Sequence, residues 1–349
     1  MVDETLAKGR STVYNKITSP IKLEEVNPKN KELQEEFLEY LDTIGRAKST
    51  IMQYEQMLNV FFVWNMENNK NKYFIDLNKR DFMKFQNYGI NEYGWSPARV
   101  RTVRAALSSL SNFVTDILDD EFPDYKSSVK KIEAPINTQV RTKTVFSLEE
   151  LQRLLDHLVE NKKYMKAAIL ALMMFSGRRK AEITRFKVSY FDKENLICGN
   201  ALYMTPEPLR TKGRGRNGKM LTVYVLAKQF EPYLRMWMKY REENGIESEW
   251  LFPNANDPSR TIGVEVIDSF SDEFTKFLGK PWYPHSMRSF YTTYLLEQNI
   301  PEDVVTTIIG WSTRDQISTY DLRTKESQLD KYFGADGIKQ VEKKSLDDL

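Results

Sequence analysis

The sequence holds few of the residues that build disulfide frameworks and metal sites. Its 349 residues include one cysteine, Cys198, and two histidines, His157 and His285. A lone cysteine forms no internal disulfide, so the composition predicts a reducing, cytoplasmic setting. Structural zinc sites need several cysteine or histidine ligands, and we therefore expect neither a metal site nor a cofactor.

The sequence also lacks long apolar runs. Its mean hydropathy is −0.55, and no stretch has the length and apolar character of a membrane-spanning helix. Residues 1–4 contain no basic segment that leads into an apolar one, so no signal peptide is expected. The hydrophobic fraction of 41% is still sufficient for sizeable cores, and at this length two domains are the natural expectation.

A strong excess of positive charge is absent as well. The chain has 51 lysines and arginines against 49 acidic residues, which gives a formal net charge of +2. This balance argues against a uniformly basic protein that coats nucleic acid, but it allows local basic surfaces. One such segment, residues 209–219, holds five basic residues, three glycines and no acidic residue.

The sequence divides into parts of different composition. The stretch from residue 122 to 145 is basic and contains prolines. Such a composition suits either a segment that lies along a polyanion or an ordinary solvated linker. Ser147 followed by Glu150 forms a capping box, so a new helix and a new domain are expected to begin there. We expect an N-terminal extension (1–31), a helical domain (32–121), a basic linker (122–145) and a second domain with a C-terminal tail (146–349).

The first domain has the apolar periodicity of helices. Leu33, Phe37 and Leu41 repeat at helical spacing, and Ser49 or Thr50 is expected to cap the next helix.

A later helix of the same domain is expected to open at Ser96. Its polar side carries Arg99, Arg101 and Arg104 without an acidic neighbour on the first turns. A solvated helix face is one interpretation of these arginines. Contact with phosphate groups is the other, and we favour it because three cations gather near one helix start.

The second domain is expected to be built around an apolar helix from Lys163 to Phe175, which Gly177 ends. Short strands are expected at residues 195–204 and 220–226. The remainder is expected to be helical, in segments at about 228–243, 264–278, 286–298, 301–309 and 313–320.

Three segments far apart in the sequence carry residues that suit one chemistry. Arg179 follows the central apolar helix, His285 and Arg288 lie on one face of a later helix, and Trp311 and Tyr320 come after it. Metal-free cleavage of a phosphodiester needs groups that neutralise the phosphoryl oxygens, a positioned nucleophile and a proton for the leaving oxygen. Arginine forks, a histidine and a tyrosine meet these needs.

Each residue has an expected role in that chemistry. Arg179 and Arg288 bind the non-bridging oxygens, and His285 binds the phosphate and exchanges the tyrosine proton. Trp311 donates its indole N–H to an oxygen, and Tyr320 is the nucleophile.

Two further residues complete the expected site. Lys212, in the basic segment, can reach the leaving 5′ oxygen as a general acid, and Lys219 is the alternative. Glu182 lies three residues after the first arginine and is expected to orient side chains in the pocket.

These residues resemble the tyrosine recombinase (phage integrase) family, which includes Cre, the Xer proteins and integrases of mobile elements. The segment S-G-R-R-K-A-E, from Ser176 to Glu182, matches the family's Thr/Ser-Gly-x-Arg-x-x-Glu box. The match assigns the catalytic arginine to Arg179 rather than to Arg178.

The family's second box is also matched. His285 and Arg288 fit its His-x-x-Arg pattern, and Ile309-Gly310-Trp311 followed by Tyr320 fits its Leu-Gly-His/Trp and tyrosine. The tryptophan replaces the commoner histidine, as it does in Cre. The segment Arg210-Thr211-Lys212 looks like the Cre-type version of the family's β-hairpin lysine.

The resemblance implies a fold. We expect a mainly α protein with a small antiparallel β-sheet in the C-terminal domain. The two domains, a helical SAM-like core-binding domain and a catalytic domain, would form a C-shaped DNA clamp.

The resemblance also implies a function, that of a site-specific DNA recombinase of a phage or other mobile element. Such an enzyme cuts and rejoins double-stranded DNA at a specific site through a 3′-phosphotyrosine, without metal or ATP. Assembly as a tetramer on DNA, an accessory DNA-bending or excision factor and association with the nucleoid are expected. The alternatives are a Xer-like resolvase, a DNA-binding regulator that has lost recombination, and a topoisomerase of type IB.

Basic residues outside the catalytic set are candidates for contact with DNA. They are Lys48, Arg99, Arg101, Arg104, Lys130, Lys131, Arg141, Lys143, Arg210, Arg214 and Arg216. We interpret Arg178, Lys180 and Arg185 as solvated or close to phosphate, and His157 as structural. Residues Leu329, Tyr332 and Phe333 are expected either to pack on their own domain or, as in the family, to dock on a neighbouring protomer.

Overall fold

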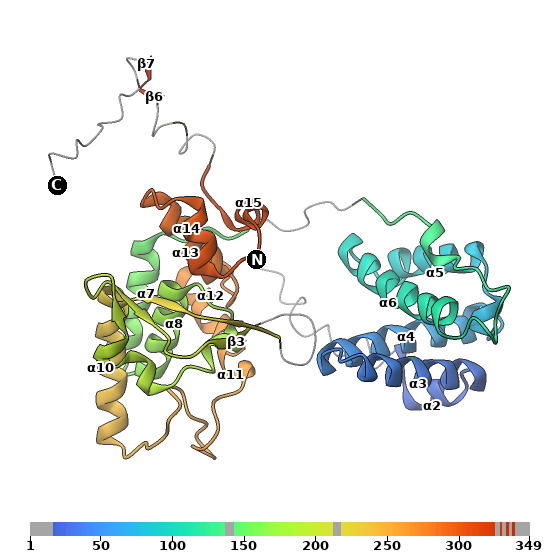
Figure 1. Ribbon diagram of the computed structural model, residues 1–349, viewed down its shortest axis with the longest axis horizontal. Coiled ribbons are helices and arrows are strands. Elements are labelled where there is room, and N and C mark those ends of the chain that lie inside the picture. The colour runs from blue at the N-terminus through green and yellow to red at the C-terminus, as the bar shows by residue number, and fades with distance from the viewer. Residues whose placement is uncertain are drawn as a thin grey trace. The chain divides into compact units, whose positions relative to one another are not determined.

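The computed structural model describes residues 17–136, 143–211, 218–324, 329, 333–334 and 337–338 (Figure 1). The chain forms two compact units, the first mainly of residues 1–142 and the second mainly of residues 143–349. No helix in the described ranges has the length and apolar content needed to cross a membrane.

The regular elements among the described residues of the first unit are all helical. Its core is rich in aromatic rings, with Phe61 edge-on to Phe85 at 4.9 Å between centroids and stacked on Phe82 at 5.6 Å. The elements are α2 (Pro20–Glu24), α3 (Pro28–Thr43), α4 (Lys48–Asn68), η1 (Phe74–Asp76), α5 (Lys79–Asn91), α6 (Pro97–Asp116) and η2 (Val129–Lys131).

Local capping decides where these helices begin. Ser96 caps α6 as expected, because its side chain accepts the backbone N–H of Arg99. The prediction that Ser49 or Thr50 caps α4 is wrong, since the helix already starts at Lys48 and its N-cap is Ala47. The Ala47 carbonyl accepts the backbone N–H of Thr50 at 2.8 Å, which places both predicted caps inside the first turn.

Two segments interpreted as peripheral pack onto this unit. Val26, within the predicted N-terminal extension, is buried, and the boundary at residue 31 falls inside α3. The amide of Asn30 donates to the Lys72 carbonyl at 2.9 Å. In the predicted linker, Val129 is buried and the Tyr125 hydroxyl lies 2.8 Å from that of Ser111. The first part of that stretch therefore continues the helical unit.

The second unit is built around α8 (Tyr164–Ser176), in which every residue from Ala167 to Ser176 is buried. Helices α7 (Leu148–Glu160), α10 (Ala227–Glu243) and α13 (Ser286–Glu297) pack against it (Figure 1). The predicted capping box is present, with Ser147 and Glu150 each accepting the other's backbone N–H. The remaining helical elements are α9 (Lys180–Ile183), η3 (Val188–Phe191), η4 (Lys193–Asn195), α11 (Val264–Asp268), α12 (Ser271–Leu278), α14 (Glu302–Ile309), η5 (Arg314–Gln316) and α15 (Ile317–Tyr320).

Short antiparallel strands complete this unit. A three-stranded sheet has the order β1-β2-β5, and a two-stranded hairpin pairs β3 with β4 in the register Thr211 opposite Lys219. The bounds are β1 (Leu196–Ile197), β2 (Leu202–Met204), β3 (Leu209–Thr211), β4 (Lys219–Leu221), β5 (Tyr224–Leu226), β6 (Phe333–Gly334) and β7 (Gly337–Ile338). The last two pair with each other.

Candidate active site

The turn between α8 and α9 presents the first arginine of the site. Gly177 ends α8 with a left-handed backbone, φ 61°. A Cβ atom there would lie 2.5 Å from Cδ1 of Tyr291 and 2.8 Å from Cδ1 of Ile309, so only glycine fits. Arg179 follows in extended conformation, with its side chain 31% exposed. The chain is thus turned so that this guanidinium reaches the surface.

Glu182 forms a salt bridge with the Arg179 guanidinium. Its carboxylate is almost completely buried, and Oε1 accepts Nη1 of Arg179 at 2.9 Å. Oε2 accepts the backbone N–H of Arg179 at 3.2 Å. The charged, two-point contact fixes both the main chain and the side chain of the arginine.

Arg288 lies one turn into α13 and is 1% exposed. Its Nη1 donates to the Gly177 carbonyl at 2.9 Å and its Nη2 to the Ile309 carbonyl at 3.2 Å. Burial, together with the neighbouring Arg179 and Arg178 cations, lowers the pKa of this guanidinium to about 9. It therefore remains a cation at neutral pH in a site of strong positive potential.

Tyr320 lies beside the second arginine, at the end of α15. Its hydroxyl is 2.9 Å from Nε2 of His285, the N-cap residue of α13. The Trp311 ring is 4.9 Å from the Tyr320 ring, and the Arg288 guanidinium carbon is 5.7 Å from that ring. The structure therefore brings together the predicted nucleophile, its predicted proton acceptor and a cation.

Two buried donors of the site have no acceptor among the described residues. They are Nε of Arg288 and Nε1 of Trp311. Buried N–H groups without an acceptor are costly and uncommon in proteins. The Arg288 guanidinium carbon is 5.3 Å from the Trp311 ring centroid, so both donors belong to one small region. Their arrangement suits an anionic oxygen ligand.

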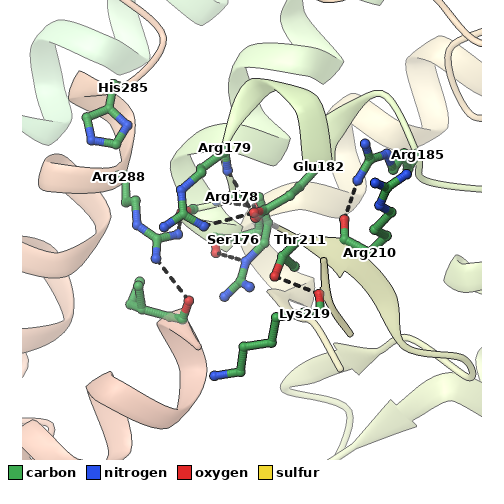
Figure 2. A network of polar contacts seen from close by, with 12 residues as sticks. Ser176, Arg178, Arg179, Glu182, Arg185, Arg210, Thr211, Lys219, His285 and Arg288 are labelled. Atoms are coloured by element: carbon green, nitrogen blue, oxygen red, sulfur yellow. Dashed lines mark hydrogen bonds and ion pairs between the residues drawn. The ribbon is translucent and has the colours of Figure 1, made fainter. Parts of the chain in front are cut away.

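The β3–β4 hairpin reaches the same region through Lys219, whose Nζ lies 3.3 Å from Oγ of Ser312, next to Trp311 (Figure 2). The hydroxyl of Thr211, on the facing strand, donates to the Lys219 carbonyl at 2.8 Å. The predicted catalytic residue Lys212 lies outside the described residues.

The prediction that Arg178 is solvated is wrong, whereas its closeness to a phosphate stays a prediction. Arg178 is 1% exposed, and Figure 2 shows it near Arg179 and Glu182. Lys180 and Arg185, for which the same prediction was made, are nearer the surface. Lys180 pairs with Asp268, and Arg185 donates to the Arg210 carbonyl.

The candidate DNA-binding residues fall into three groups. Lys48, Lys130, Lys131 and Arg210 are exposed. Others are held by neighbours: the Arg99 guanidinium lies 5.9 Å from the Trp95 ring, Arg101 donates to the Pro135 carbonyl, Arg104 donates to the carbonyls of Val129 and Ile132, and Lys143 donates to the Thr319 carbonyl. The candidates Arg141, Arg214 and Arg216 lie outside the described residues.

Sequence reasoning missed two features of this site. One is the burial of Arg178, which no local sequence pattern indicates. The other is the contact of Lys143 with the residue before Tyr320, which joins positions 176 residues apart. No local pattern announces such a contact. His157, interpreted as structural, packs its ring 4.6 Å from that of Phe277.

Two arginines, a histidine and a tyrosine gathered in one region define a centre suited to phosphodiester chemistry. The family model described as Phage integrase family matches residues 144–326, and that described as Phage integrase, N-terminal SAM-like domain matches residues 33–124. The chain belongs to the phage integrase family. The predicted family and the mainly helical fold with small antiparallel sheets are confirmed.

Individual relatives cover nearly the whole chain. The SPbeta prophage-derived recombinase-like protein YomM of Bacillus subtilis is 25% identical over 343 residues, 95% of this chain and 98% of the relative. Tyrosine recombinase XerA of Pyrococcus horikoshii is 24% identical over 300 residues, 85% of this chain and 90% of the relative.

Solved structures share the fold at lower identity. The XerH site-specific recombinase bound to a palindromic difH substrate has a TM-score of 0.62 and 17% identity, covering 87% of this chain and 96% of that one. The Tn1549 transposon integrase in complex with circular intermediate DNA has a TM-score of 0.63 and 15% identity, covering 86% and 98%.

Proposed function

We propose that the protein is a site-specific DNA recombinase of a phage or other mobile element, and that it cuts and rejoins double-stranded DNA through Tyr320. The observation that carries this proposal is the 2.9 Å contact between the Tyr320 hydroxyl and Nε2 of His285, beside the Arg288 guanidinium. DNA binding alone has no need of a hydroxyl placed against a proton acceptor.

In the proposed cleavage step, the Tyr320 oxygen forms a bond to the scissile phosphorus and the bond to the 5′ oxygen breaks. The tyrosine proton passes to His285, within the observed contact distance. Arg179 and Arg288 neutralise the non-bridging oxygens, and Trp311 donates its indole N–H to one of them. The products are a 3′-phosphotyrosine and a free 5′-hydroxyl. Attack by a partner strand's 5′-hydroxyl reverses the step.

The leaving 5′ oxygen takes its proton from a hairpin lysine. We propose Lys212 for this role on its motif, with Lys219 as the alternative. The Nζ of Lys219 contacts Ser312 beside the tryptophan of the site, which supports a hairpin lysine near the reacting atoms. Because the phosphotyrosine stores the energy of the broken bond, the cycle needs neither metal nor ATP.

The partner proposed for this chain is duplex DNA containing a specific recombination site. The XerH and Tn1549 integrase structures, which share its fold, contain DNA. We propose that residues 32–121 form a core-binding domain and residues 146–349 the catalytic domain, joined by a basic linker. Exposed Lys48, Lys130 and Lys131 are suited to phosphate contact. Assembly as a tetramer, help from an accessory DNA-bending or excision factor and a cytoplasmic, nucleoid-associated location complete the proposal.

A Xer-like role in resolving multimers is the second candidate. The match to tyrosine recombinase XerA over 85% of this chain favours it. A resolvase recombines copies of its own host's site, whereas an element's integrase joins two different attachment sites. Recombination between two directly repeated host sites on one plasmid would therefore indicate the resolvase role.

The test is covalent trapping on a nicked suicide substrate taken from the element's attachment region. Wild-type protein is expected to form a protein–DNA adduct on a denaturing gel, and Tyr320→Phe is expected to form none. Tyr240→Phe, on α10 and stacked on Trp237 at 5.7 Å, is the matched control and should behave as wild type. Specific DNA binding without any adduct from wild-type protein would contradict the proposal and favour a regulator.

A further inference from the structure

Arg178 is a buried cation that no step of the proposed cleavage uses. In the described part of the chain, no carboxylate forms an ion pair or hydrogen bond with it. Its partners are main-chain carbonyls: Nε donates to Ser176 at 3.2 Å, and Nη2 donates to Ile308. Burial lowers the pKa of the guanidinium, as expected for a cation removed from water. The nearby Glu182 carboxylate offsets part of this effect without forming a hydrogen bond or ion pair with Arg178.

The direct hydrogen-bond partners of Arg178 lie at two helix ends. Ser176 is the last residue of α8, and Ile308 is in the last turn of α14. Helix C-termini carry a partial negative charge and carbonyls without intrahelical partners. One guanidinium therefore satisfies carbonyls of two helices and is itself stabilised by both dipoles.

Every one of the last four carbonyls of α14 has a donor. The Gly310 N–H reaches the carbonyls of Thr306 at 2.9 Å and Thr307 at 3.1 Å. Arg178 takes the Ile308 carbonyl, and Arg288 takes that of Ile309 at 3.2 Å. Arg178 and Arg288 thus complete the C-terminal capping of α14. Removal of either arginine would leave one of these carbonyls without its donor.

Arg288 also joins the same two helices, since its other nitrogen donates to the Gly177 carbonyl just past α8. Arg178 and Arg288 therefore each link the C-terminal end of α8 to the C-terminal end of α14 through hydrogen bonds to main-chain carbonyls. Arg179 is the third residue after the first of these ends. Trp311, which packs against the Tyr320 ring, follows the second after a single glycine.

We propose that Arg178 is a positioning residue, which sets the place of Trp311 and Tyr320 relative to Arg179 without touching the phosphate. This inference rests on the proposed function. Loss of its contacts frees the Ile308 carbonyl and the α14 end while leaving the phosphate-binding side chains chemically intact. The expected defect is in the rate of cleavage and not in the affinity for DNA.

The test compares Arg178→Met and Arg178→Lys with Arg241→Met. Arg241 is a matched control: it is buried on α10 and donates to the carbonyls of Ser248 and Trp250, both at 2.8 Å, in a region remote from the site residues. Single-turnover adduct formation is measured with saturating suicide substrate, and affinity for an uncleaved site is measured separately by fluorescence anisotropy.

Arg178→Met is expected to slow adduct formation roughly 100-fold, the effect of misplacing reacting groups by about 1 Å, with affinity close to wild type. Arg178→Lys should recover part of the rate, because an ammonium group keeps the charge but lacks the planar fork that bridges two carbonyls. Arg241→Met should lower thermal stability and keep the wild-type cleavage rate. A wild-type rate in Arg178→Met, or equal losses of affinity and rate, would overturn the inference.

A fluorine NMR measurement tests the position of Trp311 without relying on activity. Protein labelled with 5-fluorotryptophan contains six labelled indoles, and Trp311→Phe assigns the relevant resonance. That resonance should shift in Arg178→Met and Arg178→Lys but not in Arg241→Met, while Trp64 of the first unit serves as the reference. If Arg178→Met does not fold, Arg178→Lys decides, and an unshifted resonance refutes the inference. If wild-type protein forms no adduct, the proposed function fails and the resonance alone decides the positioning role.

Discussion

Gly177 is a position at which a single methyl group should destabilise the fold through both the backbone and the packing. Replacing it by alanine places a side chain on a left-handed backbone, which costs about 1–2 kcal/mol. The added Cβ also meets Tyr291 at 2.5 Å and Ile309 at 2.8 Å, and overpacking a dense core costs about 1–3 kcal/mol more. We therefore expect Gly177→Ala to lose roughly 2–5 kcal/mol of unfolding free energy.

A second glycine of the same unit separates the two contributions. Gly279, at the end of α12, has φ +67°, and a Cβ there would meet nothing within 4 Å. Gly279→Ala should therefore lose only the backbone part, about 1–2 kcal/mol. The difference between the variants measures the packing of the α8 end against Tyr291.

Urea denaturation followed by circular dichroism provides both free energies, and thermal melting should show Gly177→Ala lower by roughly 5–15 °C. The activity should also fall, because the carbonyl of residue 177 holds the Arg288 guanidinium. Equal losses in Gly177→Ala and Gly279→Ala would refute the packing argument, and full activity in a stable Gly177→Ala protein would refute the link between this turn and the site.

Three further predictions concern the charged groups. Glu182→Gln should slow adduct formation roughly tenfold with little change in DNA affinity, since a charged hydrogen bond is lost. A substrate with a 5′-phosphorothiolate leaving group, which departs without a proton, should rescue Lys212→Met but not Lys219→Met if Lys212 is the acid; the opposite rescue would exchange the two assignments. Burial alone would raise the pKa of Asp81, but a backbone N–H and Lys72 outweigh it and lower that pKa. The first unit should therefore lose stability as pH falls below about 4, through the lowered pKa, and Asp81→Asn should remove that dependence in urea titrations.

Features set by neighbouring residues could be predicted from the sequence. Ser96, Ser147 and Gly177 cap or end helices as expected, because a cap depends on a side chain and the next three or four backbone groups. Ser49 and Thr50 show the limit of the same reasoning: several adjacent positions can start a helix, and packing chooses among them.

Irregular connections were harder to predict. The expected strand at 195–204 is two strands, because Cys198, Gly199 and Asn200 take positive φ in a turn between them. The expected helix at 264–278 is likewise divided, with α11 ending at Asp268 and α12 beginning at Ser271. Apolar periodicity continues through such breaks and does not reveal them.

The site itself was recognisable from residue types and order, but its interior was not. The 2.9 Å contact of His285 with Tyr320 joins residues whose types already indicated one reaction. Arg178 could not be placed, because an arginine next to a surface arginine is usually solvated. Its burial depends on two helix ends that meet only in the folded unit, and no sequence pattern records their meeting.

The helix that carries Tyr320 is a single turn, from Ile317 to Tyr320. A helix of that length has almost no stability of its own, because nucleation costs more than one turn of hydrogen bonds returns. What holds it are contacts from outside: His285 on the hydroxyl, Thr293 on the Tyr320 carbonyl at 3.4 Å, and Lys143 on the preceding carbonyl. The position of Tyr320, the proposed nucleophile, therefore depends on contacts from other elements, and we expect α15 to shift without unfolding of the rest of the unit.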